Sequence, residues 1–190
     1  MHMPYTQGEI FSDNDYTAKP LPLGEYEDCT FRNGNFQGAD LGNCIFATCT
    51  FINCNLAGVR LAKAALKDVT FTNCNLLGIS FHSCSPMLFQ VSFSECDMSG
   101  TSFYKLKLKQ TEFRSCKLQK ADFSDADLSD AQFHDCDLSR AIFDNTNLER
   151  ADLRTASNFT INPEQNKIKA LKISSQNLSG LLEKYELEIE

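Results

Sequence analysis

The sequence predicts an all-β fold, a solenoid whose coils have four sides, and three regularities carry this prediction. A large apolar residue recurs every five residues, a small or medium residue stands two positions before it, and polar residues fill the rest. Matching residues also recur every twenty positions. Short repeats indicate a solenoid, because a single repeat cannot bury its apolar side chains alone. The large residues run from Tyr26 to Phe81 and again from Phe93 to Leu153.

The geometry of a β-strand explains the five-residue period. Side chains on a strand alternate between two faces, so two residues separated by two positions point the same way. The next inward pair begins three residues later, so the chain must turn a corner after each repeat. Each pentapeptide is therefore one side of a polygon. The twenty-residue series Cys96, Cys116 and Cys136 favours four sides per coil.

The cysteines follow the same repeat and are expected inside the solenoid. The chain has nine of them, and residues such as Cys29, Cys96 and Cys136 stand two positions before a large apolar residue. Stacked cysteines would have Cα atoms about 4.8 Å apart, so distance alone does not forbid a disulfide. We expect reduced thiols, because free cysteine packs as a small apolar residue and stays reduced in the cytoplasm.

An interruption separates two blocks of repeats. From Phe81 to Phe93 the step is twelve residues, two more than two repeats require. We expect a small bulge near Pro86, with Met87, Leu88 and Phe89 competing for the core. This bulge is either an insertion that the solenoid wall tolerates or a protruding loop that contacts a partner through Pro86, Met87 and Leu88.

The chain divides into three expected segments. Residues 1–23 are an N-terminal cap or degenerate coil, residues 24–157 are the β-helix interrupted near 84–92, and residues 158–190 are a C-terminal capping segment. A cap is required because the end of a solenoid exposes unpaired backbone groups.

The C-terminal segment carries its own pattern. A short capping strand is expected over residues 168–173, and Ser174 or Ser175 offers an N-cap for a short α-helix. The apolar face of this helix contains Leu178, Leu181, Leu182 and Tyr185. Leu187 and Ile189 then alternate with glutamates, which predicts a terminal strand.

Composition limits the functions that the chain can have. No apolar run approaches the length of a membrane span, and no basic segment followed by an apolar stretch opens the chain, so a cytoplasmic location is expected. His82 and His134 are expected to point outward, and no nucleophile stands at a triad spacing from them. There is no paired C-x-x-C motif and no phosphate-binding glycine loop. We expect no enzyme activity, no catalytic or metal-binding residues and no cofactor.

The repeats resemble those of the pentapeptide repeat family. The stretches 121–125, 126–130 and 151–155 read ADFSD, ADLSD and ADLRT and match its A-(D/N)-L-x-x signature. The resemblance implies a right-handed quadrilateral β-helix with a short C-terminal helix. The tail looks like those of the AlbG, McbG and Qnr-type members, which implies a homodimer through Leu178, Leu181, Leu182, Tyr185, Leu187 and Ile189. Those relatives act on DNA gyrase and topoisomerase IV, in some cases by imitating B-form DNA.

The distribution of charge bears on this implied mimicry. The net charge is −7, and acidic residues concentrate between residues 121 and 153, whereas residues 100–120 are basic. The predicted acidic contact surface consists of Asp122, Asp125, Asp127, Asp130, Asp135, Asp137, Asp144 and Asp152.

Two hypotheses therefore stand. In the first, a dimeric DNA mimic binds DNA gyrase or topoisomerase IV and protects it from a drug or toxin, with no direct binding to nucleic acid or membrane. In the second, the chain is a rigid protein-interaction scaffold unrelated to topoisomerases. If the acidic residues lie on all four faces with lysines among them, mimicry loses its physical basis.

Overall fold

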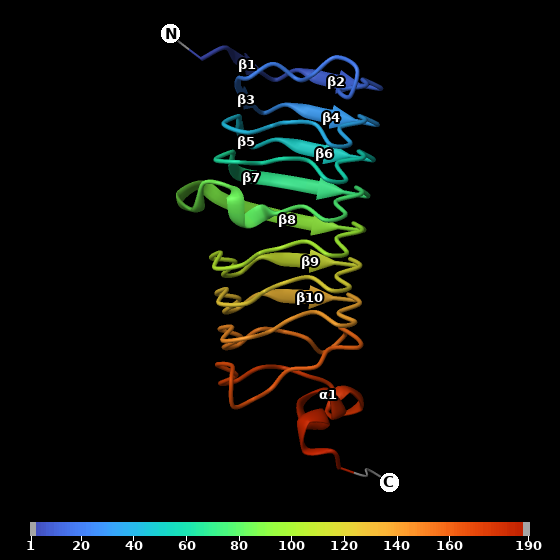
Figure 1. Ribbon diagram of the computed structural model, residues 1–190, viewed down its shortest axis with the longest axis vertical. Coiled ribbons are helices and arrows are strands. Elements are labelled where there is room, and N and C mark those ends of the chain that lie inside the picture. The colour runs from blue at the N-terminus through green and yellow to red at the C-terminus, as the bar shows by residue number, and fades with distance from the viewer. Residues whose placement is uncertain (1–2, 188–190) are drawn as a thin grey trace.

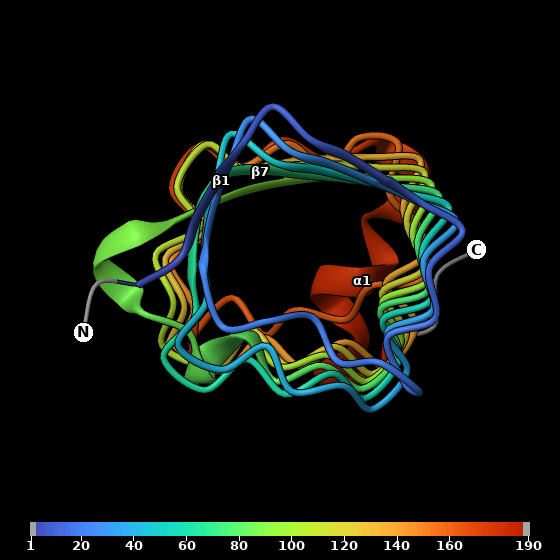
Figure 2. The same ribbon diagram turned by 90° about the horizontal axis from the view of Figure 1, so that it is seen from above.

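The computed structural model describes residues 3–187 and shows a parallel β-solenoid, a right-handed quadrilateral β-helix with a short C-terminal helix (Figure 1). The predicted fold class is confirmed. Seen along the long axis, the coils superpose in a four-sided outline, and helix α1 (Ser179–Leu182) lies within that outline at the C-terminal end (Figure 2).

The strands are short and every pair is parallel. They are β1 (Tyr5–Gln7), β2 (Ile10–Ser12), β3 (Glu25–Glu27), β4 (Thr30–Arg32), β5 (Ile45–Ala47), β6 (Thr50–Ile52), β7 (Ala65–Thr72), β8 (Phe89–Ser94), β9 (Glu112–Arg114) and β10 (Gln132–His134). Four 3-10 turns complete the structure: η1 (Phe81–Ser83), η2 (Pro86–Leu88), η3 (Ser175–Asn177) and η4 (Glu183–Tyr185).

The pairing register confirms twenty residues per coil. Phe31 of β4 pairs with Phe51 of β6, and Phe113 of β9 pairs with Phe133 of β10. Isolated bridges continue the same offset where no strand is assigned, as between Asp122 and Ile142.

Each coil contributes one large side chain to each of four walls, and these side chains fill the core. We number the walls by their inward residues. Wall 1 contains Phe31, Phe51, Phe71, Phe93, Phe113 and Phe133; wall 2 contains Phe36, Leu56, Leu76, Met98, Leu118 and Leu138; wall 3 contains Leu41, Leu61, Phe81, Phe103, Phe123 and Phe143; wall 4 contains Tyr26, Phe46, Leu66, Phe89, Leu108, Leu128 and Leu148.

Aromatic rings order this core. Along wall 1, Phe93, Phe113 and Phe133 stack with ring centroids 5.4 Å and 4.8 Å apart. Phe103 and Phe123 of wall 3 meet Phe113 edge to face at 5.9 Å and 6.1 Å. Both geometries are favourable for aromatic pairs, so the core is a regular lattice of rings.

Most corners use the left-handed backbone conformation. The residue two positions after the large apolar residue has a positive φ, as at Gly58 (φ 65), Asn73 (φ 50) and Asp125 (φ 56), except after Phe81, Phe89 and Leu153. Glycine, asparagine and aspartate tolerate this conformation best, which explains their frequency at this position. Thr48 adopts the same conformation (φ 54), although its β-branched side chain disfavours a positive φ.

The small inward residues have a chemical role that explains the cysteines. The thiols of Cys54 and Cys74 donate to the carbonyl oxygens of Phe31 and Phe51 in the coil above, each at 3.4 Å. Thr146 and Asn166 donate to carbonyl oxygens at equivalent positions, each at 2.9 Å. A thiol is therefore one of several small donors that suit this site.

The interruption is a bulge of two 3-10 turns, η1 and η2, and it projects from one corner (Figure 2). The side chain that fills the core is Phe89, which is 7% exposed, whereas Met87 is 91% exposed and Leu88 is 44% exposed. Beyond the bulge the register between β7 and β8 shifts to Val69 opposite Val91.

Regular pairing extends past the expected repeat range at both ends. Strands β1 and β2 pair with β3 and β4 in the common register, so residues 5–12 belong to a coil. Lys167 and Lys172 form bridges to Asn147 and Asp152, which places residues 167–172 in a last coil and not in a separate capping strand.

Candidate protein-binding surface

The eight predicted contact aspartates are distributed over all four walls. Bridges place Asp122 on wall 3, Asp127 on wall 4, Asp137 on wall 2 and Asp152 on wall 1. The others follow by their position in the repeat: Asp125 and Asp144 on wall 3, Asp130 on wall 4 and Asp135 on wall 1. The structure therefore does not gather them on one face.

Most of these aspartates also have structural roles. The Oδ1 atoms of Asp122, Asp127, Asp137 and Asp152 accept the backbone N–H two residues later, at 3.0 to 3.1 Å. Each of these side chains thereby caps a corner as an Asx turn. The remaining aspartates include three left-handed corner residues, which are Asp125, Asp130 and Asp135. The acidic composition is thus largely a consequence of the repeat.

Asp137 is the most completely bonded of the set. Its Oδ2 accepts the Gln119 amide at 2.7 Å, and its Oδ1 accepts the Ser139 hydroxyl at 2.6 Å and the Asn158 amide at 2.9 Å. Partial burial alone would raise the pKa of Asp137, but the hydrogen bonds from Asn158, Ser139 and Gln119 outweigh it and lower the pKa to about 2.

Between residues 100 and 140 the charges form two adjoining rings, one basic and one acidic, and not a stripe along one wall. The turn of chain 100–120 contains Lys105, Lys107, Lys109, Arg114, Lys117 and Lys120 with Glu112, and the next turn contains Asp122, Asp125, Asp127, Asp130, Asp135 and Asp137 with Arg140. Lys107 pairs in register with Asp127 below it, and Lys117 with Asp137. Opposite charges therefore lie one coil apart, about 4.8 Å along the axis.

Ion pairs engage two further aspartates. Arg150 makes two hydrogen bonds to Asp130, at 2.7 Å and 2.9 Å, and this interaction lowers the pKa of Asp130. Arg154 binds Asp152 at 2.7 Å and lowers the pKa of that carboxyl in the same way. Among the eight predicted aspartates, only Asp135 and Asp144 have a carboxylate that accepts no hydrogen bond from a described residue, so they are the freest of this set.

The thiols lie in the interior of the solenoid, away from solvent. All nine cysteines are free and buried, and burial raises the pKa of Cys49 to about 11 and that of Cys84 to about 12. Such thiols remain protonated near neutral pH and are poor nucleophiles. Within residues 3–187 no group of three or more His, Cys, Asp or Glu side chains has a metal-binding arrangement.

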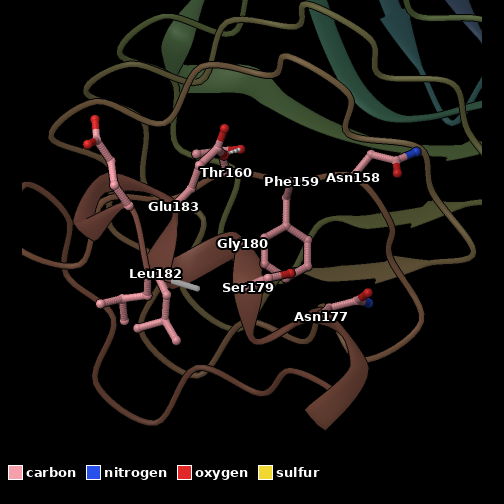
Figure 3. Close-up of a pocket in the computed structure, with 10 residues that line it drawn as sticks. Asn158, Phe159, Thr160, Asn177, Ser179, Gly180, Leu182 and Glu183 are labelled. Atoms are coloured by element: carbon pink, nitrogen blue, oxygen red, sulfur yellow. Dashed lines mark hydrogen bonds between the residues drawn. The ribbon is translucent and has the colours of Figure 1, made fainter. Parts of the chain in front are cut away.

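The C-terminal cap closes the last coil (Figure 3). The Ile161 amide donates to the Gly180 carbonyl at 2.8 Å. A Cβ atom added to Gly180 would lie 2.3 Å from the Phe159 carbonyl oxygen, so only glycine permits this approach. A hollow of about 540 Å³ lies beside this contact and is lined by Phe159, Leu182 and Leu187 among others.

The predicted dimer residues divide into two groups. Leu181 packs against the core and Leu182 is half-buried, so both take part in capping. Leu178, Tyr185 and Leu187 are 47%, 45% and 57% exposed. Residue 187 is not in a strand, and Ile189 lies outside the described residues.

One part of the surface was missed by the sequence analysis. Lys107 and Lys109 line a hollow of about 370 Å³ beside the bulge, together with Phe89 and Gln90. The available signal was the coincidence of the twelve-residue step with lysines eighteen and twenty residues after Phe89, on the same wall.

Comparisons with known proteins place the chain in context. The model of the pentapeptide repeat region matches residues 25–85 and 87–159. No curated protein sequence matches. Among solved structures, HetL from the cyanobacterium Nostoc, a pentapeptide repeat protein involved in heterocyst differentiation regulation, has 14% identity and a TM-score of 0.59 over 90% of this chain and 86% of its own. A trypsin-treated variant of QnrB1, a plasmid-mediated fluoroquinolone resistance protein, has 20% identity and a TM-score of 0.46 over 99% and 98%.

No helix among the described residues is long and apolar enough to cross a membrane.

Proposed function

Because the chain belongs to the pentapeptide repeat family, we propose that it acts as a non-enzymatic, rigid protein-binding rod in the cytoplasm. The observation that supports this proposal is the closed core: the thiols and the large apolar side chains point inward and are buried. Function then depends on the outer walls, which are flat, polar and held by coil-to-coil hydrogen bonds.

A cytoplasmic location forms part of this proposal. Nine unpaired thiols persist in a reducing compartment, and the donor role of Cys54 and Cys74 requires the S–H form.

Cross-linking mass spectrometry in the producing cells tests the rod proposal. We expect one or a few proteins cross-linked to lysines on the outer walls in reproducible positions. Cross-links only within the chain, under conditions where known complexes in the same cells are recovered, would refute the proposal.

A type II topoisomerase, DNA gyrase or topoisomerase IV, is the second and more specific candidate. The net charge of −7 and the ring of six aspartates favour it, because an acidic surface suits a protein that binds DNA. Two features weigh against imitation of DNA along one face: the aspartates are distributed over four walls, and a basic ring adjoins them. Contact would therefore involve Asp135 of the acidic ring together with Asp144 of the next coil.

A supercoiling assay with purified gyrase, with and without a gyrase poison, tests this candidate. Inhibition or protection that is reduced by the double variant Asp135→Asn/Asp144→Asn would support it, because neither carboxylate holds the fold together. Absence of inhibition, protection and binding at micromolar protein would leave only the scaffold role.

Dimerisation is proposed through the exposed part of the cap. Leu178 and Leu187 are apolar, about half exposed and not needed to seal the core. The double variant Leu178→Glu/Leu187→Glu should be monomeric by light scattering, whereas an unchanged dimer mass would reject this interface.

A further inference from the structure

The coil-to-coil pairing on wall 4 is broken at one level, beside the bulge. Above it, bonded strands connect Tyr5 to Glu25, Glu25 to Ile45 and Ile45 to Ala65. Below it, bridges connect Lys107 to Asp127, to Asn147 and to Lys167. No bridge among the described residues joins Lys107 to the coil above. The extra residues of the bulge thus leave an open seam.

The seam has two edges that regular coils would join. Its upper edge is β8, which pairs with β9 only from Phe93 onward. Its lower edge is the segment 107–111, and the Lys107 amide has no backbone acceptor in the part of the chain described. The hollow of about 370 Å³ lies between these edges, and its lining includes Phe89, Gln90, Lys107 and Lys109.

The charge around this seam is positive and unpaired. Lys107 and Lys109 are exposed, and neither forms an ion pair with a described residue. Asp68 is the one acidic residue in the lining. A carboxylate in the seam would meet two ammonium groups and a free amide, all of which favour an anionic oxygen.

The bulge adds an apolar element next to this charge. Met87 and Leu88 directly precede the Phe89 edge of the seam, and their side chains are 91% and 44% exposed. Methionine is flexible and polarisable and is common at binding surfaces. An apolar pair beside unpaired lysines is complementary to a segment that carries an apolar residue next to acidic ones.

We propose that this seam is the docking site for an acidic, apolar-containing segment of a partner protein. The inference rests on the proposed role as a protein-binding rod and specifies where the partner is held and by what chemistry. Nucleic acid is disfavoured as the occupant, because its continuous phosphate backbone would extend from the lysines onto the ring of six aspartates one coil below, whereas a short acidic segment can end within the seam, where Asp68 is the single acidic lining residue.

Titration of the full-length chain with a short peptide tests the site. The probe is acetyl-Glu-Glu-Leu-Phe-Glu-Glu-amide, and its counterpart has glutamine in place of every glutamate. Nitrogen-15 amide spectra should shift at Gln90, Lys107 and Gln110, and the glutamine peptide should bind about tenfold more weakly or not at all.

Matched variants distinguish specific binding at the seam from non-specific attraction between opposite charges. Lys107→Ser/Lys109→Ser should weaken binding about tenfold. Lys167→Ser/Lys169→Ser removes the same charge from the same wall, at a level where pairing is regular, and should change binding less than about twofold. Met87→Ser should weaken binding without changing the dependence on glutamate.

Three results would overturn the proposal that the seam is a docking site. They are no change in amide chemical shifts at its edges, equal losses of peptide affinity in the two lysine variants, or tighter binding of an oligothymidine than of the peptide. If the seam fails while cells still yield cross-links at another wall, the rod proposal survives. If the peptide titration and the cross-linking in cells are both negative, the seam proposal and the rod proposal both fail.

Discussion

Substitution of Asp137 by asparagine tests whether the acidic residues are structural before they are functional. The carboxylate accepts hydrogen bonds from Gln119, Ser139 and Asn158, and its pKa is lowered from 3.8 to about 2. At 1.36 kcal/mol per pKa unit this corresponds to about 2.5 kcal/mol in favour of the charged form. Partial exposure to solvent reduces the expected contribution to about 1–2 kcal/mol.

The pH dependence follows from the direction of this shift. A carboxyl group whose pKa is lowered in the folded state stabilises the fold above its unfolded pKa and loses that effect as the pH falls toward 2. The stability difference between the native chain and Asp137→Asn should therefore be full at pH 5 and pH 7. It should shrink between pH 4 and pH 2.

Urea denaturation followed by far-ultraviolet circular dichroism measures this difference, and Asp144→Asn is the matched control. Asp144 carries the same charge on the same acidic stretch but its carboxylate accepts no hydrogen bond from a described residue. A decrease in the free energy of unfolding of less than about 0.3 kcal/mol for Asp137→Asn at pH 7 would refute the reasoning. So would an equal loss for Asp144→Asn, or a loss that persists unchanged at pH 3.

Three further substitutions test the core, the corners and the cap. Phe113→Ala should destabilise by about 3–5 kcal/mol in urea melts, because Phe113 is fully buried between stacked rings; a cost under about 1 kcal/mol would contradict the packed lattice. Thr48→Gly should stabilise by about 1 kcal/mol by relieving a positive φ at a β-branched residue, and a lower melting temperature would contradict this. Gly180→Ala should increase hydrogen exchange throughout residues 174–187, because the added methyl group collides with Phe159; unchanged protection would show that the cap does not depend on this contact.

The core was predictable because the repeat encodes it twice. The five-residue spacing identifies the inward residues, and the twenty-residue recurrence identifies which of them stack, as for Phe113 and Phe133. The cysteines were placed correctly inside, since packing position follows from the period alone. Their donation to carbonyl oxygens was not predicted, because that contact joins residues on neighbouring walls of successive coils.

The surface was predicted less well, for a physical reason. Local charge counts along the chain hide the fact that successive repeats face four directions, so Asp122, Asp127 and Asp137 appear adjacent in sequence but lie on different walls. The register that places the core also assigns these walls. At the bulge, the spacing permitted Met87, Leu88 or Phe89 to enter the core, and only the geometry of the two 3-10 turns selects Phe89.

The tail shows the same limit. Its last coil has Asn158 and Pro163 at positions where earlier coils carry large apolar residues, so the period is invisible although backbone pairing continues to Lys172. The predicted helix forms as three short turns, η3, α1 and η4, and Gly180 of α1 passes close to Phe159.

Site-specific photo-cross-linking in the producing cells tests the central claim most directly, namely that this rod binds a protein at the bulge. A benzophenone side chain at Met87 should yield one discrete protein adduct, and that adduct should disappear in the Lys107→Ser/Lys109→Ser background. The same group at Leu77, an exposed apolar position on wall 2, should not yield it. The same adduct from Leu77, or none from Met87, would contradict the account.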